Sequence, residues 1–224
     1  MRQVANRHGV DGRSSMATTI LLLRHAHTAS NATGLDVRMS GWTDVALSDA
    51  GRREAAVVAR QIANTMQPHA LITSSLTRAV QTAREIERGC GIEACIEPCL
   101  REIGCGNVDG LTLAQVQQSY PDAWRRNLLQ CDPDFRWPAG ESYREFRERV
   151  LRTLERIART FPGERTVVVT HAGVISQVVG FLNGRSAAEW SSFRPRNCSI
   201  TELVWSDAGP RVVAFDVLPS ELAR

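Results

Sequence analysis

Two short apolar runs, each followed by a histidine, dominate the hydrophobic pattern of the chain. Residues 20–23 read Ile-Leu-Leu-Leu and lead directly into Arg24 and His25. Residues 166–170 read Thr-Val-Val-Val-Thr and lead into His171. Uninterrupted apolar runs of this length predict strands that are buried on both faces of a sheet. Open α/β sheets bind their ligands at the carboxyl ends of such strands, so both histidines are candidates for a site.

Outside these two runs, the pattern predicts helices that alternate with short strands. Apolar residues at helical spacing predict helices that begin near Ser48 and at Ser74 and Ser75, and others over 112–119, 122–129, 142–160 and 173–182. Short apolar runs predict strands over 70–73, 95–100, 199–205 and 211–218, the last two as a hairpin with a loop longer than two residues. This alternation predicts a three-layer αβα fold with a mostly parallel, mixed sheet and the hairpin at its edge. The Arg- and Glu-rich face of the helix over 142–160 is expected to be solvated.

Length, charge and hydropathy limit the class of protein. The 224 residues suit one large domain or two small ones, and a net charge of +3 gives no reason to expect binding to nucleic acid. No apolar run approaches the ~20 residues that span a bilayer, and residues 1–17 lack the apolar segment of a secretion signal. We therefore expect residues 1–17 to be a disordered extension of a cytoplasmic protein that binds neither nucleic acid nor a membrane. A homodimer is left open.

The cysteines do not predict a metal site. Cys90, Cys95, Cys99 and Cys105 lie close together in the sequence, at spacings of five, four and six residues. These spacings lack the paired C-x₂-C knuckles that bind zinc. In a cytoplasmic chain, the thiols are expected to be reduced.

Two arginines and a glutamate complete a candidate phosphate site around the two histidines. Arg78 falls in the first turn of a helix, where a cation opposes the helix dipole unless an anion binds there; for this helix alone, an arginine that turns to solvent is an equally good interpretation. Between Arg24 and Arg78, a neutral His25 would keep a low pKa and act as a nucleophile, while the guanidinium groups bind a phosphoryl group. Glu102, in the loop after the third expected strand, is the candidate acid for the leaving oxygen.

These segments resemble the sequence blocks of the histidine phosphatase superfamily. The run Arg24-His25-Ala26-His27-Thr28 with Asn31 is similar to the family signature Arg-His-Gly-Glu-Thr followed by Asn. Further blocks follow in the family's order at 41–44, 73–83, 100–103, 140–142 and 169–173. The resemblance implies a phosphoglycerate mutase-like fold and a single domain over residues 18–224.

The resemblance also implies a role for each residue of the site. His25 would be the nucleophile that becomes phosphohistidine, and Glu102 would protonate the leaving group and then activate water. Arg24, Arg78 and His171 would hold the phosphoryl oxygens, with a further hydrogen bond from Asn31. No metal or other cofactor would be needed, because the arginines supply the positive charge that magnesium supplies in other phosphoryl-transfer enzymes.

Three further residues are candidates for substrate contacts. His27 replaces the glutamate that helps to hold the second end of the substrate in the mutases, and a substrate-facing role is slightly favoured over simple packing. Arg38 occupies a loop that reaches the pocket rim in relatives. Arg101 lies next to Glu102 and either contacts the substrate or pairs with a carboxylate.

A phosphomonoesterase that hydrolyses a small phosphate ester through phosphohistidine is the function that these features favour. The first alternative is a 2,3-bisphosphoglycerate-dependent phosphoglycerate mutase. Against it stand His27 and the span of only about forty residues between Glu102 and Gly140, where the mutases carry a longer insertion. The second alternative is a non-catalytic phosphate-binding module, which the presence of both His25 and Glu102 disfavours.

Overall fold

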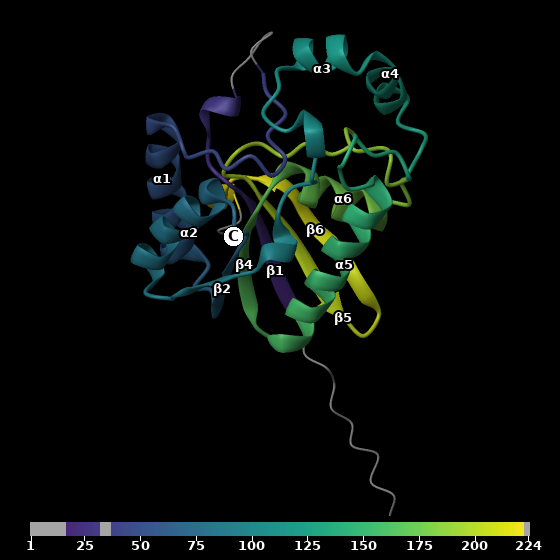
Figure 1. Ribbon diagram of the computed structural model, residues 1–224. Helices are drawn as coiled ribbons and strands as arrows, with labels where there is room; N and C mark the ends of the chain where they lie inside the picture. Colours follow the sequence, from purple (N-terminus) through teal and green to yellow (C-terminus); the bar gives the residue numbers. More distant parts are fainter. Residues whose placement is uncertain (1–16, 32–36, 222–224) are drawn as a thin grey trace, which may run out of the picture.

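The computed structural model describes residues 17–31 and 37–221, and a six-stranded sheet forms its centre (Figure 1). The strands are β1 (Thr18–Arg24), β2 (Ala70–Thr73), β3 (Ala94–Ile96), β4 (Arg165–Thr170), β5 (Ile200–Ser206) and β6 (Gly209–Val217). They lie in the order β3-β2-β4-β1-β5-β6, with β3, β2, β4 and β1 parallel and β5 and β6 antiparallel. The mostly parallel, mixed sheet that the sequence predicts is therefore confirmed, with the hairpin at its edge.

Helices cover both faces of this sheet. They are α1 (Asp49–Thr65), α2 (Thr77–Cys90), α3 (Leu113–Ser119), α4 (Pro121–Leu129), α5 (Tyr143–Thr160) and α6 (Ala172–Leu182), with short 3-10 helices η1 (Ala29–Asn31), η2 (Pro98–Leu100), η3 (Gly106–Val108) and η4 (Pro219–Glu221). One apolar core packs α1 and α2 against the sheet, and a second packs α5 and α6 against the other face. In β1, Leu21 and Leu23 enter the first core while Ile20 and Leu22 enter the second. Alternate side chains of a strand point to opposite faces, which explains why this strand is apolar at each position from 20 to 23.

A separate group of elements stands above the carboxyl ends of the parallel strands. Figure 1 shows α3 and α4 at one end of the molecule, away from the sheet. They pack on a third apolar core that includes Val108, Val116, Phe135, Trp137 and Tyr143. We call residues 105–143 the cap, because this segment covers the end of the sheet at which His25 and His171 lie.

Three boundaries differ from the sequence-based expectations. Helix α2 has Leu76 as its N-cap, without a side-chain cap hydrogen bond, and the Ser74 hydroxyl lies between His171 and the backbone N–H of Leu76. Strand β3 ends at Ile96, and Pro98 begins η2. The β5–β6 loop is tighter than expected, because Ser206 already pairs with Gly209.

The expected extension over residues 1–17 lies outside the described residues, apart from Ala17 just before β1. None of the helices within the described ranges has the length and hydropathy needed to cross a bilayer.

Candidate active site

Strand pairing brings the two histidines together. β1 and β4 are parallel neighbours with Arg24 opposite Thr170, so the next residues, His25 and His171, leave the sheet side by side. Their ring centroids are 5.2 Å apart, and the exposed fractions of the two residues are 5% and 0%. The adjacency expected from the sequence is what the fold provides.

The His25 ring is held in one tautomer. Its Nδ1 lies 2.8 Å from the backbone oxygen of Ala26, and a carbonyl oxygen only accepts hydrogen bonds, so Nδ1 carries the proton. The lone pair of the neutral ring is therefore on Nε2. Burial, followed by the charges of Arg78 and Arg24, holds the pKa of His25 well below its usual value. At neutral pH, His25 is an uncharged imidazole with a free nucleophilic nitrogen.

Arg78 is buried, although it lies in the first turn of α2. Only 3% of the residue is exposed, so its side chain does not turn out to solvent. Its Nη1 donates to the backbone oxygen of Thr43 at 2.9 Å, and its Nη2 donates to the backbone oxygens of Gly41 at 2.9 Å and Ser40 at 3.2 Å. Its Nε donates to Nδ1 of His171 at 3.2 Å. The guanidinium group is thus fixed from two sides beside the histidine pair.

His171 is fixed by protein partners at both ring nitrogens. Because Nδ1 accepts from Arg78, the proton of the neutral ring is on Nε2, which lies 2.7 Å from the Ser74 hydroxyl. Burial and the nearby Arg78 charge hold the pKa of His171 well below its usual value. In this structure, therefore, the ring orients Arg78 directly.

Arg24 has a buried N–H group that is not used in a hydrogen bond with the described residues. Its Nη1 donates to the backbone oxygen of Pro195 at 2.7 Å. Its Nε is buried and has no hydrogen-bond partner among the described residues. Since buried N–H groups are rarely left unpaired, this donor is well suited to an oxygen atom of a bound phosphoryl group.

Glu102 faces the N-terminus of α6. Its Oε2 accepts a hydrogen bond from the backbone N–H of Gly173 at 2.9 Å, and its Oε1 accepts from its neighbour Ile103 at 3.0 Å. A side chain at Gly173 would displace the Glu102 carboxylate, since a Cβ atom there would lie 2.0 Å from Oε1. Arg24 and Arg78 both interact electrostatically with this carboxylate, which places it at the edge of the same site.

Two residues that the sequence did not single out hold the Glu102 loop. The Trp42 indole donates to the backbone oxygen of Glu102 at 2.8 Å. Arg149 forms an ion pair with Glu141 at 2.7 Å and donates to the backbone oxygens of Cys99, Arg101 and Glu102 at 2.7, 3.0 and 3.3 Å. The side chain of Arg149 is only 19% exposed. The expectation that the whole charged face of α5 is solvated is therefore wrong at this position.

The remaining candidates lie at the margins of the site. The His27 ring is hydrogen-bonded at 2.9 Å to Ser48, the N-cap of α1, and does not line the cavity described below. The Arg101 guanidinium stacks 4.0 Å from the Trp42 ring centroid. Arg38 donates to the backbone oxygen of Gly110 at 2.9 Å. Asn31 ends η1, and its side chain lies outside the described part of the structure.

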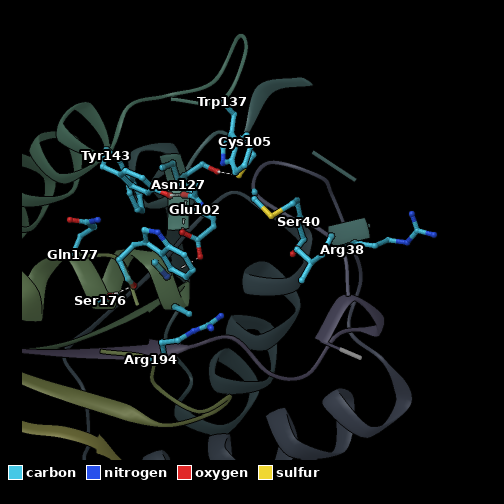
Figure 2. A pocket seen from close by; sticks show the side chains of 18 of the residues that line it. Arg38, Ser40, Glu102, Cys105, Asn127, Trp137, Tyr143, Ser176, Gln177 and Arg194 are labelled. Carbon is cyan, nitrogen blue, oxygen red and sulfur yellow. Dashed lines mark hydrogen bonds between the residues drawn. The ribbon is translucent and has the colours of Figure 1, made fainter. Parts of the chain in front are cut away.

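A cavity of about 320 Å³ opens beside Glu102, between the cap and α6. Figure 2 shows Glu102 within the group of lining side chains, with Asn127 and Tyr143 from the cap side and Ser176 and Gln177 from α6. Across residues 17–31 and 37–221, no group of three or more histidine, cysteine, aspartate or glutamate side chains is arranged to hold a metal ion.

Comparison with known proteins agrees with this geometry. Residues 20–217 match the histidine phosphatase superfamily (branch 1). The chain is 34% identical over 184 residues to a probable phosphoglycerate mutase GpmB of Cronobacter sakazakii, covering 82% of this chain and 83% of that protein. It is 33% identical over 176 residues to a metal-independent phosphoserine phosphatase of Arabidopsis thaliana, covering 78% and 72%.

Solved structures show the same fold. Bacillus stearothermophilus YhfR is 26% identical, with a TM-score of 0.81 over 90% of this chain and 98% of that chain. A mycobacterial glucosyl-3-phosphoglycerate phosphatase is 25% identical, with a TM-score of 0.77 over 90% and 99%. By their names, the relatives thus include two phosphatases and a probable phosphoglycerate mutase. With a match that spans nearly the whole described chain, the protein belongs to the histidine phosphatase superfamily (branch 1).

Proposed function

We propose that the protein is a phosphomonoesterase that hydrolyses a small phosphate ester through a phosphohistidine at His25. The observation that carries the proposal is the state of His25, whose Nδ1 is held by the Ala26 carbonyl group and whose Nε2 is an unprotonated nucleophile. Arg24 and Arg78 place two positive charges beside that nitrogen, where they stabilise the charge of a transferring phosphoryl group.

The residues support a two-step reaction. In the first step, His25 Nε2 forms a bond to phosphorus, the bond to the ester oxygen breaks, and Glu102 gives that oxygen a proton. In the second step, the Glu102 carboxylate takes a proton from water, whose oxygen attacks the phosphorus. The N–P bond then breaks, so that inorganic phosphate leaves while His25 is again neutral and Glu102 is again protonated.

A phosphoglycerate mutase is the second candidate, because the similarity to the probable mutases favours it. A 2,3-bisphosphoglycerate-dependent mutase has to hold the carboxylate of its substrate while the phosphoryl group returns to a different hydroxyl. His27, which replaces the mutase glutamate, is bonded to Ser48. Of the two arginines that line the cavity beside Glu102, Arg38 donates to the backbone oxygen of Gly110 and Arg194 lies over the Trp190 ring. These features favour the phosphatase over the mutase.

A rapid-quench experiment with phosphorus-labelled p-nitrophenyl phosphate tests the mechanism. The wild type is expected to trap an acid-labile, base-stable phosphoenzyme, and His25→Ala is expected to trap none and to lose about a thousandfold or more in kcat. His69→Ala is the matched control, because His69 is exposed and lies outside the site. Wild-type turnover without a phosphoenzyme would overturn the mechanism, and an absence of turnover would favour a non-catalytic phosphate-binding module.

A second assay separates the two enzymes. The protein is incubated with 3-phosphoglycerate and 2,3-bisphosphoglycerate, and both 2-phosphoglycerate and inorganic phosphate are measured. Release of phosphate without isomerisation is the expected result. Formation of 2-phosphoglycerate faster than phosphate would replace the phosphatase proposal by the mutase.

A further inference from the structure

The position of Glu102 determines where the leaving group of a substrate must lie. An acid can protonate the ester oxygen only within hydrogen-bond reach of it, and that oxygen is bonded to phosphorus on one side and to the leaving group on the other. His25 and His171 follow two paired strands, and Arg24 and Arg78 interact electrostatically with Glu102, but none of these four residues lines the cavity of about 320 Å³. Glu102 and Gly173 are among the residues that do line it, so Glu102 lies between these four residues and the cavity. The carbon skeleton of the leaving group therefore extends into this cavity.

The walls of the cavity are mainly apolar and aromatic. They include Leu113, Trp124, Leu128, Trp137, Phe146 and Trp190. The volume lies at the lower end of the range of about 300–1,000 Å³ that is usual for sites that bind small organic molecules. Such walls favour an apolar leaving group, because its surface is removed from water when it enters the cavity.

The polar side chains of the walls are largely bonded to the protein itself. Ser176 donates to the backbone oxygen of Trp190 at 2.8 Å. Gln177 accepts from Arg147 at 2.7 Å and donates to the backbone oxygen of Ala187 at 2.8 Å. The Tyr143 hydroxyl donates to Oδ1 of Asn127, which leaves the neutral amide N–H₂ group of Asn127 as a donor. A leaving group rich in hydroxyl groups would find few partners here.

Positive charge is confined to the edge of the cavity. Arg38 donates to the backbone oxygen of Gly110, and Figure 2 shows its side chain extending away from the group around Glu102 and Asn127. Arg194 is exposed, its guanidinium group lies 5.7 Å from the Trp190 ring centroid, and its charge acts on Arg24. A carboxylate that extends past these arginines to the aromatic walls would be buried as an unpaired charge, which is unfavourable.

We infer that the preferred substrates are phosphomonoesters of bulky, uncharged, apolar alcohols, with a phenyl-sized group seated in the cavity between the cap and α6. This inference rests on the proposed phosphatase function. It separates the protein from an enzyme that is selective for a short phosphorylated acid or a phosphorylated polyol, because neither presents an apolar surface to these walls.

Four esters of aliphatic alcohols test the inference without a large difference in leaving-group reactivity. They are 2-phenylethyl phosphate, glycerol 1-phosphate, phosphoserine and 3-phosphoglycerate. We expect kcat/KM for 2-phenylethyl phosphate to exceed that for each of the others by about tenfold or more, which is a usual value for filling an apolar pocket. An equal or higher value for any of the other three overturns the inference and leaves the phosphatase intact. If the protein hydrolyses none of the four esters, the phosphatase proposal itself is overturned.

Two neighbouring leucines of α4 provide a matched pair of variants. Leu128 lines the cavity, whereas Leu129 does not and is 69% exposed. Leu128→Asp is expected to lower the ratio of kcat/KM for 2-phenylethyl phosphate to that for glycerol 1-phosphate about tenfold, because it places a carboxylate at the apolar wall. Leu129→Asp is expected to keep the ratio within about twofold of the wild type. Equal ratios in the two variants would show that the apolar group does not enter the cavity.

Discussion

The backbone N–H of Gly173 donates a hydrogen bond to Oε2 of Glu102 at 2.9 Å, and a Cβ atom at Gly173 would lie 2.0 Å from Oε1 of the same carboxylate. The first turn of α6 is therefore in direct contact with the carboxyl group that we propose as the acid. Any residue larger than glycine at position 173 has to displace the Glu102 side chain, because the backbone at position 173 belongs to helix α6 and does not move easily.

Gly173→Ala is accordingly expected to reduce kcat on the order of a hundredfold, since a displacement of about 1 Å at a reacting group has effects of that size. The phosphoenzyme burst should slow in parallel with kcat. Gly89→Ala in α2 is the control, because a Cβ atom there would lie 3.4 Å from its nearest neighbour, the backbone oxygen of Ala59. Near-normal activity of Gly173→Ala would show that Glu102 is not the acid.

Arg149→Met is expected to destabilise the protein by about 2 kcal/mol, since it leaves Glu141 without its ion-pair partner and the backbone oxygens of Cys99 and Arg101 without a donor. Urea denaturation measures the change. Arg152→Met, on the same helix but with a side chain that is 75% exposed, should change stability by about 0.5 kcal/mol or less. Equal losses in the two variants would contradict the structural role of Arg149.

Acid is expected to destabilise the fold through the two buried histidines. In the folded protein, burial and the adjacent arginines hold the pKa values of His25 and His171 well below 6.5, so the unfolded chain binds protons that the folded chain does not. The stabilisation is therefore complete above about pH 6.5 and is lost as the pH falls below it, by about 1.4 kcal/mol per pH unit for each ring. Urea titrations at pH 7.5 and 5.5 measure this slope.

The His171→Asn variant should show a smaller pH slope than the wild type, whereas the same substitution at exposed His69 should leave the slope as it is. An unchanged slope in His171→Asn would mean that this ring is protonated in the folded protein, contrary to its burial between Arg78 and Ser74.

Removal of divalent cations is expected to leave turnover within about twofold of the untreated value. Arg24 and Arg78 supply fixed positive charge beside His25, which is the contribution that Mg²⁺ makes in many phosphoryl-transfer enzymes. Activity is measured after dialysis against EDTA and again after addition of Mg²⁺ or Zn²⁺. A large loss that a metal restores would contradict a clamp formed by arginines alone.

The convergence of the two histidines was predictable because local pattern and topology both specify it. Apolar runs of three or four residues mark the buried strands, and the residues that follow two parallel neighbours have to meet at one edge of the sheet. His25 and His171 are placed in this way by β1 and β4. Arg78 was ambiguous, because a single helical turn does not reveal that backbone oxygens of the 40–43 loop would enclose its side chain.

The residues that hold the Glu102 loop, Trp42 and Arg149, were not predictable, since their contacts depend on packing between distant segments. In the sequence, Arg149 resembles Arg152 and Arg156, which lie on the same charged helix. Only the approach of the 99–102 loop to α5 distinguishes it. The cavity walls likewise come from the cap and from the segments on both sides of it, and no short pattern specifies their convergence.

The cap has an apolar core of its own, distinct from the two cores that hold the helices on the sheet. In the proposed enzyme, the reacting residues lie at the strand ends, whereas part of the cavity wall belongs to a segment with its own apolar core. Substitutions in the cap are therefore expected to change substrate selectivity without disturbing the strand ends that carry His25 and His171. A library limited to residues 105–143 is thus a suitable starting point for laboratory evolution of new substrate preferences.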